Sequence, residues 1–274
     1  MEPTFVDVAG VATSVIDTGD VDGGHPPLLL LHGSGPGVSA VANWRPVILA
    51  LSVHRRVIAP DQLGFGGTAT GRKQMYGRTA WTDHACALLD ALGVGAVDVI
   101  GNSMGGAIAL SMSVARPSAI RRIVLMGTMG VAMALPDGLN TVWAYEPSVE
   151  GMREIIGLFA YNRTLITDDL VKLRYEASLN PPVRHSWAAM FPHPRQRWVD
   201  DLALSGAELN AVSQPVLMVH GRDDRVVPWQ SSSAQLVELL PDCRLHVIGG
   251  CGHWTMIEKT AEFLAVVEPF LAAG

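Results

Sequence analysis

The residues Gly101-Asn102-Ser103-Met104-Gly105 match the pattern G-x-S-x-G and stand between two different kinds of sequence. An apolar run typical of a β-strand precedes them, and a run of small residues typical of a buried helix follows. A serine between a strand and a helix needs small neighbours, because the chain must fold back sharply there. We therefore predict that Ser103 occupies a tight strand–turn–helix bend, with its hydroxyl raised beside the amides of a helix N-terminus.

Short apolar runs followed by turn residues recur along the chain, and helical patterns separate several of them. The runs lie at 28–31, 57–59, 97–100, 123–126, 216–219 and 245–248, with helical patterns at 81–92 and 231–240. This alternation predicts an α/β fold in which helices flank a mostly parallel sheet. In such sheets functional residues gather at the carboxyl ends of the strands.

The alternation breaks between residues 135 and 205, where the pattern is helical and rich in aromatic residues. Thr167 followed by Asp168-Asp169 predicts an N-cap and an acidic first helical turn. We predict a helical cap at 135–205, inserted into a core domain formed by 1–134 and 206–274. Most of its aromatic side chains would form a small core of the cap, and the others would supply apolar walls to a pocket.

Residues 216–228 contain the acid that a nucleophilic serine requires. A serine hydroxyl is a weak nucleophile, so it needs a base, and the base needs an orienting carboxylate. Asp223 and Asp224 both follow the apolar run, and the spacing G-x-x-D-x-x-x-P at 221–228 is usual for the acid in this kind of fold. We predict Asp224 as the acid and Asp223 as a surface carboxylate beside an arginine.

His253 follows the glycine-rich residues 249–252 near the end of the chain. Its place after the serine and the acid matches the order Ser, Asp, His, and we predict that His253 is the base. The other eight histidines lack such a setting. His32 opens the loop 32–37, and we expect it to fix that loop by hydrogen bonds.

The loop 32–37 follows the apolar run at 28–31 and is rich in glycine. In this position it is expected to supply one amide donor of an oxyanion hole, and the residue after the serine supplies the other. The predicted donors are the backbone amides of Ser34 and Met104. Gly35 would let the loop approach a substrate closely.

Several segments together resemble the meta-cleavage product hydrolases, enzymes of the α/β-hydrolase fold that split carbon–carbon bonds in ring-opened aromatic compounds. The segments are H-G-S-G-P-G at 32–37, N-W at 43–44, G-N-S-M-G-G at 101–106, L-R-Y-E-A-S at 173–178, M-F-P-x-P-R-Q-R-W-V-D at 190–200 and C-G-H-W at 251–254. The segment 190–200 resembles the branch that acts on monocyclic products, such as 2-hydroxymuconate semialdehyde and its 6-alkyl relatives. Met104 departs from that branch, in which many members carry Phe, and Ser34 replaces a Gly common in biphenyl-type members.

The resemblance implies hydrolysis of the C5–C6 bond of a 2-hydroxy-6-oxohexa-2,4-dienoate, a small-molecule substrate, without a cofactor or a metal. It adds Asn43, Asn102, Arg174 and Trp254 to Gly35 as substrate-binding residues. Each of the four also has a structural alternative. Asn43 would cap a helix and Asn102 would support the serine turn. Arg174 would extend its charged end to water, and Trp254 would simply pack against its neighbours. The resemblance also implies a homo-oligomer.

Three alternatives stay open on the sequence alone. A serine, an acid, a base and an oxyanion hole also suit a carboxylesterase, because they do not distinguish the leaving group. A biphenyl-type meta-cleavage product hydrolase is the second alternative. The third is a small-molecule receptor without turnover.

Composition excludes other classes of partner. The formal net charge of −6 argues against nucleic acid or an anionic membrane as the main partner. The first Lys or Arg is Arg45, so we expect no secretory signal. Three cysteines without C-x-x-C spacing suit reduced thiols and a cytoplasmic protein, and no metal-binding spacing occurs.

Overall fold

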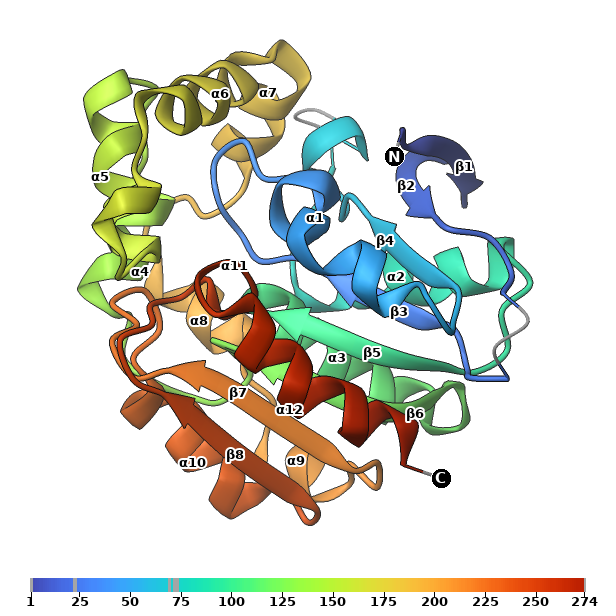
Figure 1. The fold of residues 1–274 in the computed structure, drawn as a ribbon. Helices are drawn as coiled ribbons and strands as arrows, with labels where there is room; N and C mark the ends of the chain where they lie inside the picture. The colour runs from blue at the N-terminus through green and yellow to red at the C-terminus, as the bar shows by residue number, and fades with distance from the viewer. Residues whose placement is uncertain (1, 22–23, 69, 71–73, 274) are drawn as a thin grey trace.

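One twisted sheet runs through the middle of the molecule (Figure 1). The computed structural model describes residues 2–21, 24–68, 70 and 74–273. The strands of the sheet follow the order β1-β2-β4-β3-β5-β6-β7-β8. Their bounds are β1 (Thr4–Val8), β2 (Val11–Asp17), β3 (Leu28–Leu31), β4 (Val57–Pro60), β5 (Val97–Asn102), β6 (Ile120–Met126), β7 (Val216–Gly221) and β8 (Cys243–Ile248).

Every pairing from β4 to β8 along this order is parallel, and only β1–β2 and β2–β4 are antiparallel. The predicted α/β fold with a mostly parallel sheet is therefore confirmed. The antiparallel hairpin β1–β2 was not among the predicted strands. Its first strand is largely exposed, so it lacks the continuous apolar run by which the buried strands are identified.

Helices cover both faces of the sheet and bury its central strands. One layer contains α1 (Ala40–Leu51), α11 (Thr255–Glu258) and α12 (Thr260–Ala272), as Figure 1 shows. The other layer contains α2 (Arg78–Ala91), α3 (Met104–Ala115), α9 (Gly206–Asn210) and α10 (Ser233–Leu239). All four leucines of β3 are completely buried as a result.

Between β6 and β7 the described chain forms helices and no strand. These helices are α4 (Asp137–Trp143), α5 (Val149–Phe159), α6 (Asp168–Leu179), α7 (Pro181–Ala189) and α8 (Gln196–Leu202), followed by α9. In Figure 1, α4 to α7 lie beyond the carboxyl ends of the parallel strands. Thr167 caps α6 and accepts the Leu170 amide at 3.1 Å, which confirms the predicted helix start.

The aromatic residues of this segment form a small core around Phe191. The Phe191 ring stacks on Trp143 with ring centroids 4.4 Å apart, and Trp187 and Trp198 meet it edge-on. Trp81 of α2 also stacks on Phe191, so this aromatic cluster joins the helical segment to the layer beneath it. Among the described helices, none combines the length and the apolar character needed to span a bilayer.

Candidate active site

Ser103 lies between β5 and α3 in the bend that the sequence predicts. Its backbone has φ 55° and ψ −118°, a conformation that costs free energy for a residue with a side chain. The bend is possible because its flanking positions are glycines. A Cβ atom at Gly101 would lie 2.4 Å from the Gly105 carbonyl oxygen, and one at Gly105 would lie 2.2 Å from that of Leu31.

The Ser103 side chain is buried, and its hydroxyl has no hydrogen-bond partner among the described residues. Its backbone amide donates to the Met126 carbonyl at 2.8 Å, so that amide is already engaged. The loop 32–37 packs directly against the serine, since a Cβ atom at Gly33 would lie 2.8 Å from Ser103 Cβ. Ser34 follows Gly33 directly in this loop.

His32 fixes this loop by hydrogen bonds, as predicted. The Gln62 amide donates to His32 Nε2 at 3.0 Å, which leaves Nδ1 to donate to the Gly33 carbonyl at 2.8 Å. The Gln62 side chain also donates to the His32 carbonyl. From the helical segment, Trp143 Nε1 donates to Ser34 Oγ at 2.9 Å and ties the loop to α4.

Asp224 and His253 form a buried pair at the ends of β7 and β8. His253 Nδ1 lies 2.7 Å from Asp224 Oδ2, and Asp224 Oδ1 accepts the amides of Val226 and Val227 at 2.8 and 2.9 Å. Burial alone would raise the pKa of Asp224. The charge of His253 and the hydrogen bonds from His220 and His253 outweigh it and hold the pKa well below its usual range.

Gly127 connects this pair to Ser103. The preceding residue, Met126, accepts the Ser103 amide, and a Cβ atom at Gly127 would lie 2.8 Å from His253 Nδ1. The serine and the imidazole therefore flank the same turn at the end of β6. Asp223 accepts the Gly250 amide at 2.8 Å and lies 3.5 Å from Arg222, which agrees with a supporting carboxylate near the surface.

His220, which lacks the late, glycine-rich setting of His253, nevertheless contacts the predicted acid. Its ring is fully buried, and its Nε2 lies 3.1 Å from Asp224 Oδ2. The sequence holds the signal only as a histidine four residues before the acid. His220 lies on β7 and Asp224 in the turn after it, so their side chains come into contact only because the turn folds back toward the strand.

Most of the predicted binding residues line one small pocket. It is lined by Gly33, Ser34, Gly35, Val38, Asn43, Asn102, Phe159, Arg174, His253 and Trp254. Ser103, Met104 and Asp224 are not part of its lining.

Arg174 of α6 places a buried positive charge in the wall of this pocket. Its side chain is buried, its guanidinium lies 5.5 Å from the centre of the Trp254 ring, and Nη1 lies 3.4 Å from the Gly37 carbonyl. Burial lowers its pKa to about 10. No ion pair to Arg174 occurs within the described ranges, so a buried cation faces the pocket uncompensated.

The two asparagines differ in their bonding. Asn102 Nδ2 donates to the Met126 carbonyl at 3.1 Å and thus supports the serine bend. Asn43 Nδ2, on α1, is buried and lacks a partner among the residues that the structure describes. An amide donor left open in this way has a free hydrogen-bonding capacity toward a ligand.

Phe159, at the end of α5, also lines the pocket. Its ring stacks on Trp254 at 4.9 Å and on His253 at 5.6 Å, and its carbonyl accepts the His253 amide at 2.8 Å. The sequence identified it only as one of several aromatic residues of the segment 135–205. Its role depends on where α5 ends relative to β8.

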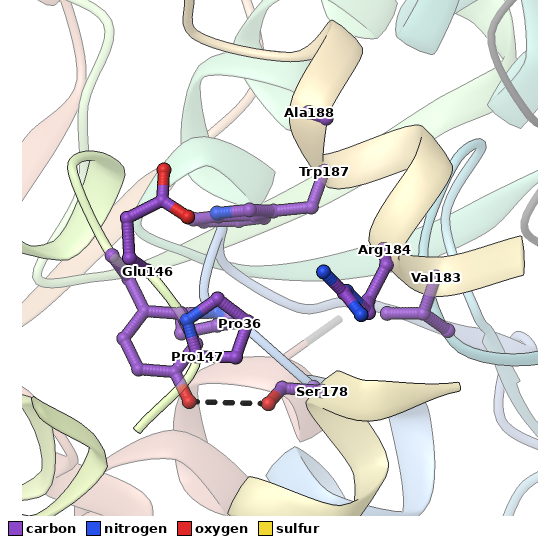
Figure 2. Close-up of a pocket in the computed structure, with 10 residues that line it drawn as sticks. Pro36, Glu146, Pro147, Ser178, Val183, Arg184, Trp187 and Ala188 are labelled. Atoms are coloured by element: carbon purple, nitrogen blue, oxygen red, sulfur yellow. Dashed lines mark hydrogen bonds between the residues drawn. The ribbon is translucent and has the colours of Figure 1, made fainter. Parts of the chain in front are cut away.

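Figure 2 shows a second, separate pocket. It lies on Pro36 and Gly37 and is walled by residues of the helical segment, among them Tyr145, Arg184 and Trp187. The Tyr145 and Ser178 hydroxyls are hydrogen-bonded across it at 3.1 Å. The described residues contain no group of three His, Cys, Asp or Glu side chains placed to hold a metal ion.

Comparison with known proteins places these features in context. Residues 26–260 match the family described as alpha/beta hydrolase fold. The chain is 48% identical to a 2-hydroxy-6-oxo-2,4-heptadienoate hydrolase of Pseudomonas putida strain F1, covering 96% of this chain and 94% of the relative. It is 47% identical to a 2-hydroxymuconate semialdehyde hydrolase of Pseudomonas sp. strain CF600, over 96% and 92%.

A solved structure is also similar. The S103A mutant of the meta-cleavage product hydrolase from Pseudomonas fluorescens IP01, complexed with acetates, superimposes with a TM-score of 0.93 at 45% identity. The match covers 97% of this chain and 96% of that chain.

Proposed function

The chain belongs to the α/β hydrolase fold family and, within it, to the meta-cleavage product hydrolases, and from that premise we propose its reaction and the residues that perform it. The reaction is hydrolysis of the C5–C6 bond of 2-hydroxy-6-oxohexa-2,4-dienoates derived from monocyclic aromatics. Its products are 2-hydroxypenta-2,4-dienoate and a carboxylic acid. The relatives at 47–48% identity are named for substrates with hydrogen or methyl at C6, which supports a small substituent here.

The observation that carries the proposal is the uncompensated cation of Arg174. A buried guanidinium without a carboxylate partner is costly, and an anionic ligand in the same pocket removes that cost. The terminal carboxylate and the 2-oxo group of a dienoate offer adjacent oxygens, which a guanidinium binds in bidentate fashion. A simple carboxylic ester has no such group, so this feature favours the dienoate over a carboxylesterase substrate.

The other open groups of the pocket suit the rest of the substrate. Asn43 Nδ2 donates to an oxygen of the bound dienoate, and Trp254 and Phe159 enclose its apolar carbons. Asn102 holds the serine bend, and Gly35 leaves room beside the loop. The segment 135–205 acts as a cap, because it contributes both Phe159 and Arg174 to the pocket walls.

Bond cleavage requires ketonisation first. The bound dienolate takes a proton at C5, with His253 as the relay, so that C5 later leaves as a delocalised dienolate rather than as a carbanion. Arg174 stabilises the oxygen charge at the carboxylate end through both states.

Ser103 then attacks the C6 carbonyl while His253 accepts the hydroxyl proton, and Asp224 orients the imidazole. The amides of Ser34 and Met104 stabilise the oxyanion. Collapse of the tetrahedral intermediate breaks the C5–C6 bond, and the departing dienolate oxygen takes the proton from the His253 imidazolium, which releases 2-hydroxypenta-2,4-dienoate and leaves His253 neutral. The acyl group on Ser103 is hydrolysed by water that His253 deprotonates, which returns the free serine and the carboxylic acid.

The experiment is a spectrophotometric assay on three dienoates with hydrogen, methyl and phenyl at C6, run beside p-nitrophenyl acetate. We expect rapid loss of the yellow dienolate absorbance with the first two and slower loss with the third. Bleaching fastest with the phenyl compound would favour the biphenyl-type alternative. Hydrolysis of the ester without bleaching of any dienoate would establish the carboxylesterase alternative. The molar mass of the protein, measured by light scattering as it elutes from a size-exclusion column, tests the homo-oligomer that the resemblance implies.

A further inference from the structure

His220 lies against the carboxylate that orients the candidate base. It is the fifth residue of β7, and the alternation of side chains along a strand places it on the same face as Met218. Its ring is fully buried between the turn that carries Asp224 and the first residue of α10, Ser233.

The contacts of the ring define its tautomer. Nε2 faces two acceptors, the Val227 carbonyl at 2.8 Å and Asp224 Oδ2 at 3.1 Å, so Nε2 carries a proton. Nδ1 lies 2.6 Å from the Ser233 hydroxyl, which can donate to it. A neutral ring with the proton on Nε2 therefore satisfies all three contacts.

Two imidazoles consequently share one carboxylate oxygen. Asp224 Oδ2 accepts from His253 Nδ1 at 2.7 Å and from His220 Nε2 at 3.1 Å, while two backbone amides occupy Oδ1. The shorter contact belongs to His253. A second donor on the same oxygen withdraws part of the negative charge that would otherwise act on His253.

We propose that His220 is a positioning residue of the reaction, which locks Asp224 Oδ2 toward His253 and limits how strongly that carboxylate stabilises the His253 imidazolium. This inference rests on the proposed roles of Asp224 and His253. It predicts that loss of the Nε2 donor makes the base hold its proton more tightly, so that activity requires a higher pH.

Few other charged or titratable groups face this cluster. Arg174 of α6 lines the same pocket as His253, and Cys251 lies two residues before it. Ser233 of α10 faces His220, and Glu258 of α11 accepts the Gly252 amide at 2.8 Å. None of these donates to Asp224 Oδ2, so the effect of His220 can be separated from theirs.

The test compares His220→Leu with His220→Gln, whose amide nitrogen can replace the Nε2 donor. For His220→Leu we expect kcat/KM to fall about tenfold at its optimum and the midpoint of the acid limb to rise by roughly half to one pH unit. His220→Gln should restore the acid limb and most of the activity. Met218→Leu, a volume-conserving change at a buried position on the same strand face, is the matched control.

Measurements on both a 6-methyl dienoate and p-nitrophenyl acetate test the proposed substrate and the role of His220 separately. Failure of the wild-type protein on the dienoate alone would reject the proposed substrate and leave the His220 test readable on the ester. If His220→Leu does not fold, Ser233→Ala takes its place, and a smaller shift of the acid limb in the same direction is expected. An acid limb and kcat indistinguishable from those of Met218→Leu would overturn the proposal, as would an unmoved limb in Ser233→Ala.

Discussion

The two sides of the active site differ in how completely their polar groups are bonded. Around Asp224, all four accepting positions of the carboxylate are occupied by two imidazoles and two amides. In the neighbouring pocket, the Asn43 amide has no partner within the described chain, and Arg174 makes a single long hydrogen bond besides its contact with the Trp254 ring. The Ser103 hydroxyl, outside the lining of that pocket, also lacks a partner among the described residues.

This difference separates groups held by the protein from groups held ready for a ligand. A fully bonded carboxylate cannot reorient, which suits a residue that must keep a base in one position. Open donors in a closed pocket cost stability, and a bound substrate restores their hydrogen bonds. Changes on the bonded side should therefore lower both stability and activity, whereas changes on the open side should lower activity alone.

The largest effect is expected for Ser103→Ala on the open side. Loss of the nucleophile should reduce kcat by about 10⁴-fold or more, with little loss of folding stability, because the hydroxyl makes no intramolecular hydrogen bond. Stopped-flow absorbance measures both dienoate binding and turnover. Ser111→Ala, which removes a hydroxyl bonded only within α3, is the control. Near wild-type turnover by Ser103→Ala would end its assignment as nucleophile.

Asp224→Asn on the bonded side should lower kcat by about 10³- to 10⁴-fold, because an amide can bind His253 only in the wrong tautomer. Unlike Ser103→Ala, it should also lower the free energy of unfolding measured in urea. Asp223→Asn changes a carboxylate that accepts a loop amide instead, and should leave kcat within a few-fold of wild type. Equal effects of the two substitutions would remove the distinction between the acids.

The pH dependence of stability should also report on the bonded side. The pKa of Asp224 is depressed in the folded protein, so its contribution is fully present above the unfolded value of about 3.9 and is lost as pH falls below it. Urea unfolding should be measured at pH values from about 3 to about 7, a range that spans the unfolded pKa. The difference in free energy of unfolding between the wild type and Asp224→Asn should shrink as the pH falls. A constant difference between the two proteins would contradict the depressed pKa.

The smallest effect is expected for Asn43→Ala, which should reduce kcat/KM for the dienoate by about tenfold through loss of one hydrogen bond to the substrate. Its folding stability should hardly change. Ser39→Ala on the same helix removes an N-cap that accepts the Ala42 amide at 3.2 Å and should show the opposite pattern, a loss of about 1 kcal/mol without loss of activity. If Asn43→Ala lost stability instead, its amide would be structural.

Sequence patterns are most informative where local constraints act. The bend at Ser103 needs glycines on both sides, and the buried strands need apolar runs, so both were predictable from neighbouring residues. Their positions after strand ends predicted that Ser34 and His253 lie close together, and both line one pocket. Asn43 on α1 and Arg174 on α6 line it too, but only the family resemblance indicated them.

Features that depend on distant packing were not predictable. His220 reaches Asp224 through a turn and is oriented by Ser233, thirteen residues later in the chain. Phe159 reaches His253 because α5 ends beside the loop after β8. The hairpin β1–β2 was not predicted because its edge strand β1 is largely exposed and lacks a continuous apolar run.

The most direct measurement combines stability and specificity in Arg174→Met. If the guanidinium is held open for the substrate carboxylate, this variant should unfold at an equal or higher temperature, with a gain of up to about 1 kcal/mol. It should also lose about 100-fold or more in kcat/KM for the 6-methyl dienoate and keep its p-nitrophenyl acetate activity within a few-fold. Arg184→Met, at an exposed position of the second pocket (Figure 2), should change neither. A destabilised Arg174→Met protein that loses both activities equally would show that Arg174 is structural and would contradict the account.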